Sequence, residues 1–133
     1  MTELVPFLMF QKGEAADAMT FYLSVFPDGE VLTDKRYGPE GPGAEGSVWM
    51  AEFTLAGQKI RCSDSPVPHD FEFTPSLSIF VTFDSRDELE KAYAALFDGG
   101  TALMPLDDYG FGPFGWVNDR FGVSWQLGVA IAA

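Results

Sequence analysis

The chain is poor in the residues that many enzymes use to bind metals or to attack a substrate. Its 133 residues include one cysteine, Cys62, and one histidine, His69. A single cysteine excludes an internal disulfide and a cysteine-rich metal site. Any catalytic triad or multi-histidine metal site would have to be built around His69. Cys62 ends a predicted strand, where a buried thiol usually behaves as a small apolar side chain.

Basic residues and long apolar runs are also scarce. Eight Lys and Arg residues stand against 20 Asp and Glu residues, which gives a formal net charge of -12, and the basic residues form no patch. Such a charge disfavours nucleic acid and anionic membranes as partners. No apolar run is long enough to span a bilayer, and no basic region followed by an apolar stretch marks the start of the chain. We therefore expect a soluble, cytoplasmic protein.

The residues that are abundant indicate a globular domain in two similar halves. Hydrophobic residues make up 47% of the chain, and 13 residues are phenylalanine. Apolar runs predict strands in the first half, and apolar spacing predicts one helix, whereas Ser85 and Glu88 form a predicted capping box at the start of a second helix. The first half has predicted strands at 4–10, 31–37, 48–55 and 58–62 and a helix at 14–26. The second has strands at 75–83 and 102–104, a helix from residue 85, a long loop at 105–113 and two final strands.

A proline-containing segment at 63–74 divides the chain into a first module at about 1–66 and a second at about 75–133. A shift of 71 residues superimposes Tyr22 on Tyr93 and Gly29 on Gly100. This agreement favours an internal repeat over two unrelated α+β halves. Two such modules can pair their sheets and enclose a cleft, because each helix covers only one face of its sheet.

Residues 115–127 are the most distinctive segment. They predict two strands around a turn that Asn118, Asp119 and Gly122 supply. Gln126 then lies on the face opposite Trp125, because strand side chains alternate. That face is either the polar wall of a cavity or a solvated surface.

Four segments carry a resemblance to a known family. They are Pro-Phe-Leu-Met-Phe at 6–10, Ala-Ala-Asp-Ala-Met at 15–19, Phe-Thr-Pro-Ser-Leu-Ser at 73–78 and Gly-Trp-Val-Asn-Asp-Arg-Phe-Gly-Val-Ser-Trp-Gln at 115–126. The chain resembles the PhnB-like proteins, also labelled 3-demethylubiquinone-9 3-methyltransferase-like. They belong to the vicinal oxygen chelate superfamily, with glyoxalase I, bleomycin-resistance proteins and extradiol dioxygenases. The resemblance implies an α+β fold of paired βαβββ modules, a homodimer and a divalent metal in the cleft.

The residues expected to bind that metal differ from those of the superfamily. Its ligands are His or Glu from the first and last strand of each module. Aligning Gly57 with Gly122 places Arg61 at the position of Gln126, and glyoxalase-like relatives carry Glu where Gln126 stands. A divalent ion prefers carboxylate or imidazole donors, and an arginine would repel it. We therefore predict no metal ligands and no cofactor, with a weakly held divalent metal as the alternative.

Arg61 and Gln126 are the predicted polar contacts of a ligand. Arginine offers a donor fork to a carboxylate or phosphate, and glutamine both donates and accepts. The alternative is an exposed arginine and a glutamine bonded to a neighbouring strand. Four further predicted ligand-binding residues are Trp49, Phe10, Ser78 and Trp116; other aromatic residues that would line an apolar pocket are Trp125, Phe53 and Phe80, although aromatic residues at strand spacing often form plain core.

His69 is a weak candidate for a catalytic general base, with a surface histidine as the alternative. Asp107, Asp108 and Tyr109 would line or gate the cleft if they have a role. The sequence therefore predicts a homodimer that binds a small organic molecule in the cleft without the usual metal. Two alternatives are a divergent metal-dependent lyase, isomerase or dioxygenase and a drug-sequestering protein of the bleomycin-resistance type. Whether any reaction is catalysed stays open.

Overall fold

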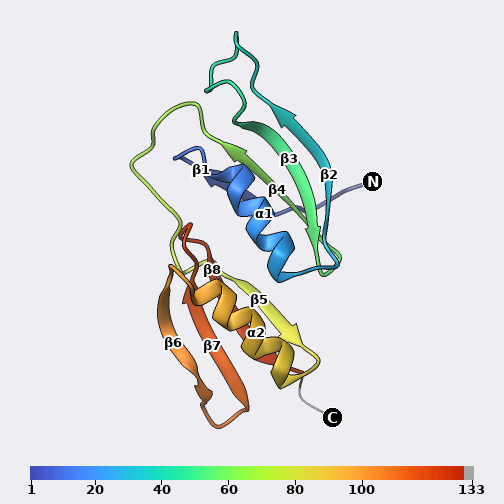
Figure 1. The fold of residues 1–133 in the computed structure, drawn as a ribbon, viewed down its shortest axis with the longest axis vertical. Helices are drawn as coiled ribbons and strands as arrows, with labels where there is room; N and C mark the ends of the chain where they lie inside the picture. Colours follow the sequence, from blue (N-terminus) through green and yellow to red (C-terminus); the bar gives the residue numbers. More distant parts are fainter. Residues whose placement is uncertain (131–133) are drawn as a thin grey trace. The chain divides into compact units, whose positions relative to one another are not determined.

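The computed structural model describes residues 1–130, so residues 131–133 of the predicted second module lie outside it. The chain divides into two compact units, Met1–Asp70 and Phe71–Ala133. Each unit has one helix and four strands, in the order strand, helix, strand, strand, strand (Figure 1). This is the βαβββ order predicted for each half.

The first unit consists of β1 (Phe7–Phe10), α1 (Ala15–Val25), β2 (Glu30–Arg36), β3 (Val48–Leu55) and β4 (Gln58–Asp64). The sheet order is β1-β4-β3-β2, with β1 parallel to β4 and the other pairs antiparallel. Helix α1 covers one face of this sheet (Figure 1). On that face, Tyr22 stacks on Phe53 with ring centroids 6.4 Å apart. The core of this unit therefore lies between α1 and the sheet.

The second unit repeats this topology with β5 (Ile79–Phe83), α2 (Arg86–Phe97), β6 (Thr101–Asp108), β7 (Pro113–Asn118) and β8 (Ser124–Val129). Its sheet order is β5-β8-β7-β6, with β5 parallel to β8. The predicted shift of 71 residues also relates Ala15 and Arg86, the first residues of the two helices. Buried side chains of α2, β7 and β8 form the core: Leu89, Leu96, Val117, Trp125 and Leu127.

A two-residue turn fixes the register between β3 and β4. Ala56 and Gly57 have φ angles of 50° and 81°, a conformation that suits the tight hairpin. Leu55 therefore pairs with Gln58, and further along Glu52 pairs with Arg61. This turn decides which side chains of β4 face away from α1.

The two helices begin in different ways. Ser85 Oγ accepts a hydrogen bond from Glu88 N at 3.2 Å, which is one of the two bonds of the predicted capping box. At the start of α1, Asp64 Oδ1 accepts from Ala15 N at 2.9 Å, and its Oδ2 accepts from Val48 N at 2.9 Å. This buried carboxylate connects β4 with α1 and β3, a role that the sequence did not indicate.

Several predicted boundaries were wrong. Strand β1 begins at Phe7 rather than residue 4, and β5 begins at Ile79 rather than residue 75. Strand β4 continues to Asp64, into the predicted linker. Strand β6 runs to Asp108 through the predicted long loop, because a register shift between Met104 and Asp107 accommodates Pro105. Apolar spacing along the second helix predicts that Phe97 lies in the core, but Phe97 is exposed at the end of α2.

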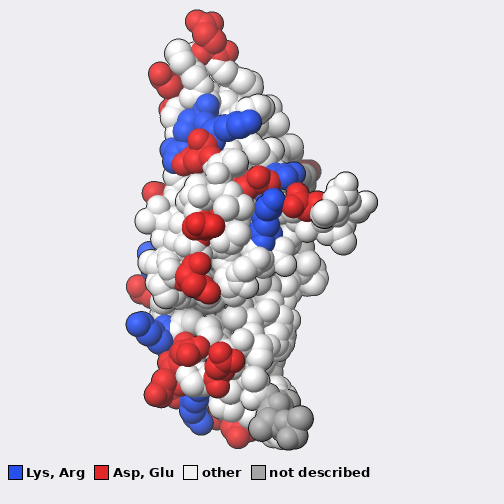
Figure 2. All heavy atoms as spheres, turned by 90° about the vertical axis from the view of Figure 1, so that its right-hand side faces the viewer, with Lys and Arg blue, Asp and Glu red and all other residues white. Residues whose placement is uncertain are grey.

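Charged side chains of both signs are interspersed on the face shown in Figure 2. Within residues 1–130, ion pairs with carboxylates are formed by Arg36, Lys59, Arg61, Arg86 and Arg120. Most carboxylates have no basic partner available, because acidic residues outnumber basic ones 20 to 8. Within residues 1–130, no helix is both long and apolar enough to cross a membrane.

Candidate functional site

Each sheet has one face that its helix does not cover, which we call the open face of that unit. In the second unit, a Cβ on Gly115 would lie 2.8 Å from the ring of Tyr93 on α2, so Gly115 faces the helix. The next residue, Trp116, and its cross-strand neighbour Gln126 therefore face the opposite way. In the first unit, the stacking of Phe53 on α1 similarly places Glu52 and Arg61 on the open face.

A polar cluster occupies the middle of the open face of the second unit. Gln126 Nε2 donates to Ser78 Oγ at 2.7 Å, and Trp116 Nε1 donates to Ser124 Oγ at 2.8 Å. Within residues 1–130, no side chain or backbone group donates to Gln126 Oε1. The structure thus brings together three of the predicted ligand-binding residues: Ser78, Trp116 and Gln126. We call these three and Ser124 the Gln126 cluster.

Arg61 occupies the matching place in the first unit. It pairs with Phe7 on β1 and Glu52 on β3, as Gln126 pairs with Phe80 on β5 and Trp116 on β7. The alignment of Arg61 with Gln126 therefore agrees with the strand register. Arg61 Nε donates to Glu52 Oε2 at 2.9 Å, and this hydrogen bond lowers the pKa of the Glu52 carboxyl. A ligand anion would have to compete with that carboxylate.

Phe10 and Trp49 lie elsewhere. Phe10 belongs to the buried core, 3% exposed, and faces the same side as Leu8 and the helix. The residues that β1 presents on the open face are Phe7 and Met9. Trp49 is 51% exposed, and Lys35 Nζ lies 5.7 Å from its ring centroid. Of the other predicted pocket residues, Trp125 and Phe53 are core.

His69, the catalytic candidate, and Cys62, the single cysteine, both lie in the first unit. His69 lies in the segment after β4, where its backbone N donates to Gln11 Oε1 at 2.7 Å and its Nε2 lies 3.1 Å from Ser65 Oγ. Cys62 is buried beneath α1. Burial, together with the charge of Asp64, raises the pKa of the Cys62 thiol to about 12. The thiol is therefore neutral at physiological pH.

The residues present do not fit the divalent metal that the superfamily implies. On the open faces, β1 and β4 offer Met9 and Arg61, and β5 and β8 offer Phe80 and Gln126. A thioether, a guanidinium, a ring and an amide do not make the carboxylate or imidazole set that such ions prefer. Within residues 1–130, no three His, Cys, Asp or Glu side chains are grouped closely enough to hold a metal ion.

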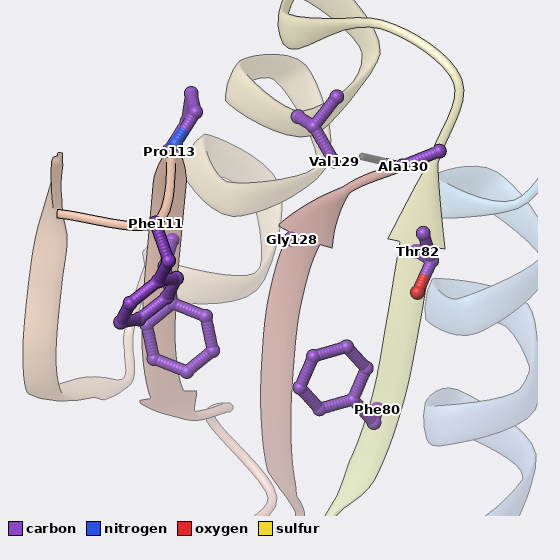
Figure 3. Close-up of a pocket in the computed structure, with 8 residues that line it drawn as sticks. Phe80, Thr82, Phe111, Pro113, Gly128, Val129 and Ala130 are labelled. Atoms are coloured by element: carbon purple, nitrogen blue, oxygen red, sulfur yellow. The ribbon is translucent and has the colours of Figure 1, made fainter. Parts of the chain in front are cut away.

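A pocket of about 280 Å³ lies on the second unit, and one of its lining residues, Phe80, pairs with Gln126 across the β5–β8 ladder. Figure 3 shows the rings of Phe80 and Phe111 on either side of β8, with Gly128 between them. The lining residues are Phe80, Thr82, Phe111, Pro113, Phe114, Gly128, Val129 and Ala130. We call this cavity the aromatic pocket.

The sequence indicated Phe80 as a pocket residue. It did not indicate Glu52, the partner of Arg61, or the pocket residues Phe111 and Gly128. Glu52 could have been found by counting outward from the Ala56–Gly57 turn, which pairs it with Arg61. No comparable signal marked Phe111 or Gly128, because their position depends on the path of the chain before β7 and on the pairing of β8.

Each of the two units has a single helix and a four-stranded sheet with the same strand order. This arrangement defines a protein of the glyoxalase/bleomycin-resistance fold. A glyoxylase/bleomycin resistance protein/dioxygenase domain from Frankia has 13% identity and a TM-score of 0.70, covering 100% of this chain and 95% of that one. The fosfomycin resistance protein FosX from Listeria monocytogenes has 13% identity and a TM-score of 0.65, covering 98% and 94%. At such identities the likeness shows the fold alone.

A family model and a solved structure of higher sequence identity show the family to which the chain belongs. A family model described as 3-demethylubiquinone-9 3-methyltransferase matches residues 2–128, and the chain belongs to this PhnB-like family. A PhnB protein from Bacillus cereus has 46% identity and a TM-score of 0.93, covering 97% of this chain and 100% of that one. A Pseudomonas aeruginosa protein has 26% identity and a TM-score of 0.82, covering 97% and 98%. The comparison with curated proteins found no match.

Proposed function

We propose that this protein binds a small organic molecule on the open face of its second unit, with the Gln126 cluster as the polar contact. The observation that carries the proposal is the hydrogen bonding of the Gln126 amide. Ser78 Oγ fixes its Nε2 at 2.7 Å, while its Oε1 accepts no hydrogen bond within residues 1–130. A held amide with an available acceptor, beside the flat indole of Trp116, suits a ligand that has both a donor group and an apolar surface.

We also propose that binding needs no divalent metal, because Gln126 and Arg61 stand where the superfamily places anionic or imidazole ligands. Metal analysis of protein purified without chelators is expected to find less than one ion per chain. Stoichiometric zinc, nickel or manganese would contradict this part of the proposal and favour the divergent metal-dependent enzyme.

Binding is proposed in preference to the methyl transfer that the family description names. Each sheet has one parallel strand pair and two antiparallel pairs. Neither is therefore the parallel, doubly wound sheet in which a nucleotide cofactor lies against a glycine-rich turn. The protein is offered as a binding module, and turnover of a bound molecule would make it an enzyme.

The test is a thermal-shift screen of neutral, cationic and anionic small molecules, because a ligand that prefers the native state raises the melting temperature. Each ligand found is then titrated against Gln126→Leu, which is expected to weaken binding about tenfold through loss of the amide. Gln58→Leu is the matched control, because Gln58 is an exposed residue of the first unit. Equal affinities for wild type, Gln126→Leu and Gln58→Leu would overturn the role of Gln126.

A further inference from the structure

We propose that the aromatic pocket binds a flat aromatic cation, with its ring among Phe80, Phe111 and Phe114 and its positive charge beside Asp107. The inference rests on the proposed function in one respect, because it places the ligand on the same open face. Gly128 lies two residues beyond Gln126 on β8, and both face away from α2. The inference goes further by naming the chemical class of the ligand.

The walls of the pocket suit a ring. Phe114 is almost fully buried, whereas Phe80 and Phe111 are 59% and 57% exposed. The centroid of Phe114 lies 6.2 Å from that of Phe80 and 5.6 Å from that of Phe111, the latter in an edge-on arrangement at 68°. A flat ligand would cover both exposed rings and form offset or edge-on contacts, which add to the gain from apolar burial.

Gly128 forms the floor of the pocket and leaves it free of a side chain. A Cβ built on Gly128 lies 3.7 Å from Phe80 Cζ and 3.9 Å from its Cε1, which is ordinary contact. A larger side chain at Gly128 would extend into the space that a ligand ring needs. Thr82 supplies the single hydroxyl among the eight lining side chains. The pocket therefore accepts a mostly apolar molecule with room for one polar contact.

Charge selects between an anionic and a cationic ligand. None of the eight lining residues is charged, but Asp107 lies directly across the β6–β7 ladder from Phe114, and Asp108 from Pro113. Directly opposed side chains share a face, so the Asp107 carboxylate lies on the side of the Phe114 ring. Arg86, which also interacts with both carboxylates, is already paired with Glu90 at 2.9 Å. The local field therefore favours a cation, as do the faces of the exposed rings.

Three bicyclic probes of similar size test the class of ligand: the cation 1-methylquinolinium, neutral 2-naphthol and anionic 2-naphthoate. Calorimetric titration of the full chain is expected to show 1-methylquinolinium binding at least about tenfold more tightly than 2-naphthoate. Equal or tighter binding of 2-naphthoate would overturn the inference.

Two variants locate the site. Gly128→Val is expected to weaken binding of 1-methylquinolinium and 2-naphthol alike by about tenfold or more, since it fills the floor. Asp107→Asn is expected to weaken binding of the cation by about threefold, because the Asp107 charge is partly exposed. The affinity for 2-naphthol is expected to stay unchanged. Phe111→Ala, which removes a ring that is 57% exposed, is expected to weaken binding of both probes. Unchanged affinities in Gly128→Val and Phe111→Ala would show that the probes bind elsewhere.

Gln126→Leu separates this inference from the proposed function. The cation has no group that bonds to an amide, so its affinity is expected to stay within about twofold of wild type. If 1-methylquinolinium does not bind while other ligands still depend on Gln126, the aromatic pocket is wrong and the proposed function stands. If the cation binds in the pocket and no ligand depends on Gln126, the pocket stands and the role of Gln126 is wrong.

Discussion

Asp119 explains at the residue scale why the last hairpin is so distinctive. Its Oδ1 accepts hydrogen bonds from Phe121 N at 2.8 Å and Val123 N at 3.1 Å, and its Oδ2 accepts from Trp125 Nε1 at 2.9 Å. The side chain is 3% exposed. One carboxylate therefore fixes the turn and the buried indole of the next strand, and the family signature around it is structural.

Removing this carboxylate should be costly. Asp119→Ala is expected to lower the free energy of unfolding by about 3 kcal/mol, because two buried N–H groups and one partly buried N–H group lose their acceptor. Urea denaturation measures the change. Asp98→Ala is the control, since Asp98 is 80% exposed where it meets Arg120. A loss for Asp119→Ala no larger than the control's would show that the turn holds without the carboxylate.

Cys62 gives the protein a pH dependence on the alkaline side. Its pKa is raised from 9.0 to about 12, so between these values the folded state keeps a proton that the unfolded state has lost. The stabilisation from the neutral thiol is complete below about pH 9 and is lost as the pH rises towards 12. Urea midpoints of wild type are expected to fall faster from pH 9 to 11 than those of Cys62→Ala. Parallel curves would contradict the buried, neutral thiol.

At the scale of elements, Gly115 and Gly128 lie on opposite faces of one sheet and differ in the space available for a side chain. A Cβ at Gly115 on β7 would lie 2.8 Å from the Tyr93 ring, but at Gly128 on β8 it would meet Phe80 at 3.7 Å. Gly115→Ala is therefore expected to destabilise the protein by about 1–3 kcal/mol, and Gly128→Ala by less than about 1 kcal/mol. Thermal and urea unfolding of both variants compare the two faces. Equal losses would mean that the sheet, rather than α2, resists the added methyl.

The sequence predicts the elements well where spacing and turn chemistry agree. The helix at 14–26, the Ala56–Gly57 turn and the Ser85 cap all follow from local rules, and so does the face of Gln126. The run at 4–10 has no alternation, so it could not show that Phe10 faces the core while Phe7 and Met9 face the open side. Pro105 suggested a loop, and only pairing with β7 shows that the strand continues past it.

The candidate site was predictable in part for the same reason. Gln126, Ser78 and Trp116 lie on strands or next to them, where alternation assigns a face. The aromatic pocket combines Phe111, which precedes β7, with Gly128 on β8, and their proximity depends on tertiary pairing. Glu52 was missed although its register with Arg61 follows from the turn.

At the scale of the whole molecule, the net charge of -12 makes stability depend on salt. Repulsion among unpaired carboxylates disfavours the compact state, and salt screens it within a Debye length of about 10 Å at 0.1 M. Raising NaCl from about 20 to 200 mM at pH 7 is expected to increase the free energy of unfolding by about 1 kcal/mol. Denaturant titrations at both concentrations measure this. A decrease would show that attraction within the ion pairs outweighs the repulsion.

The parallel pairing of the first and last strand in each unit has a consequence for how the chain folds. Phe7 pairs with Arg61, and Phe80 pairs with Gln126, so neither sheet can close until its fourth strand has been synthesised. Helix α1 and the antiparallel β2–β3 pair can form earlier, but β1 must wait until its partner β4 has been synthesised. On the ribosome, each unit should therefore gain its stability in one late step, because closing the largest loop comes last.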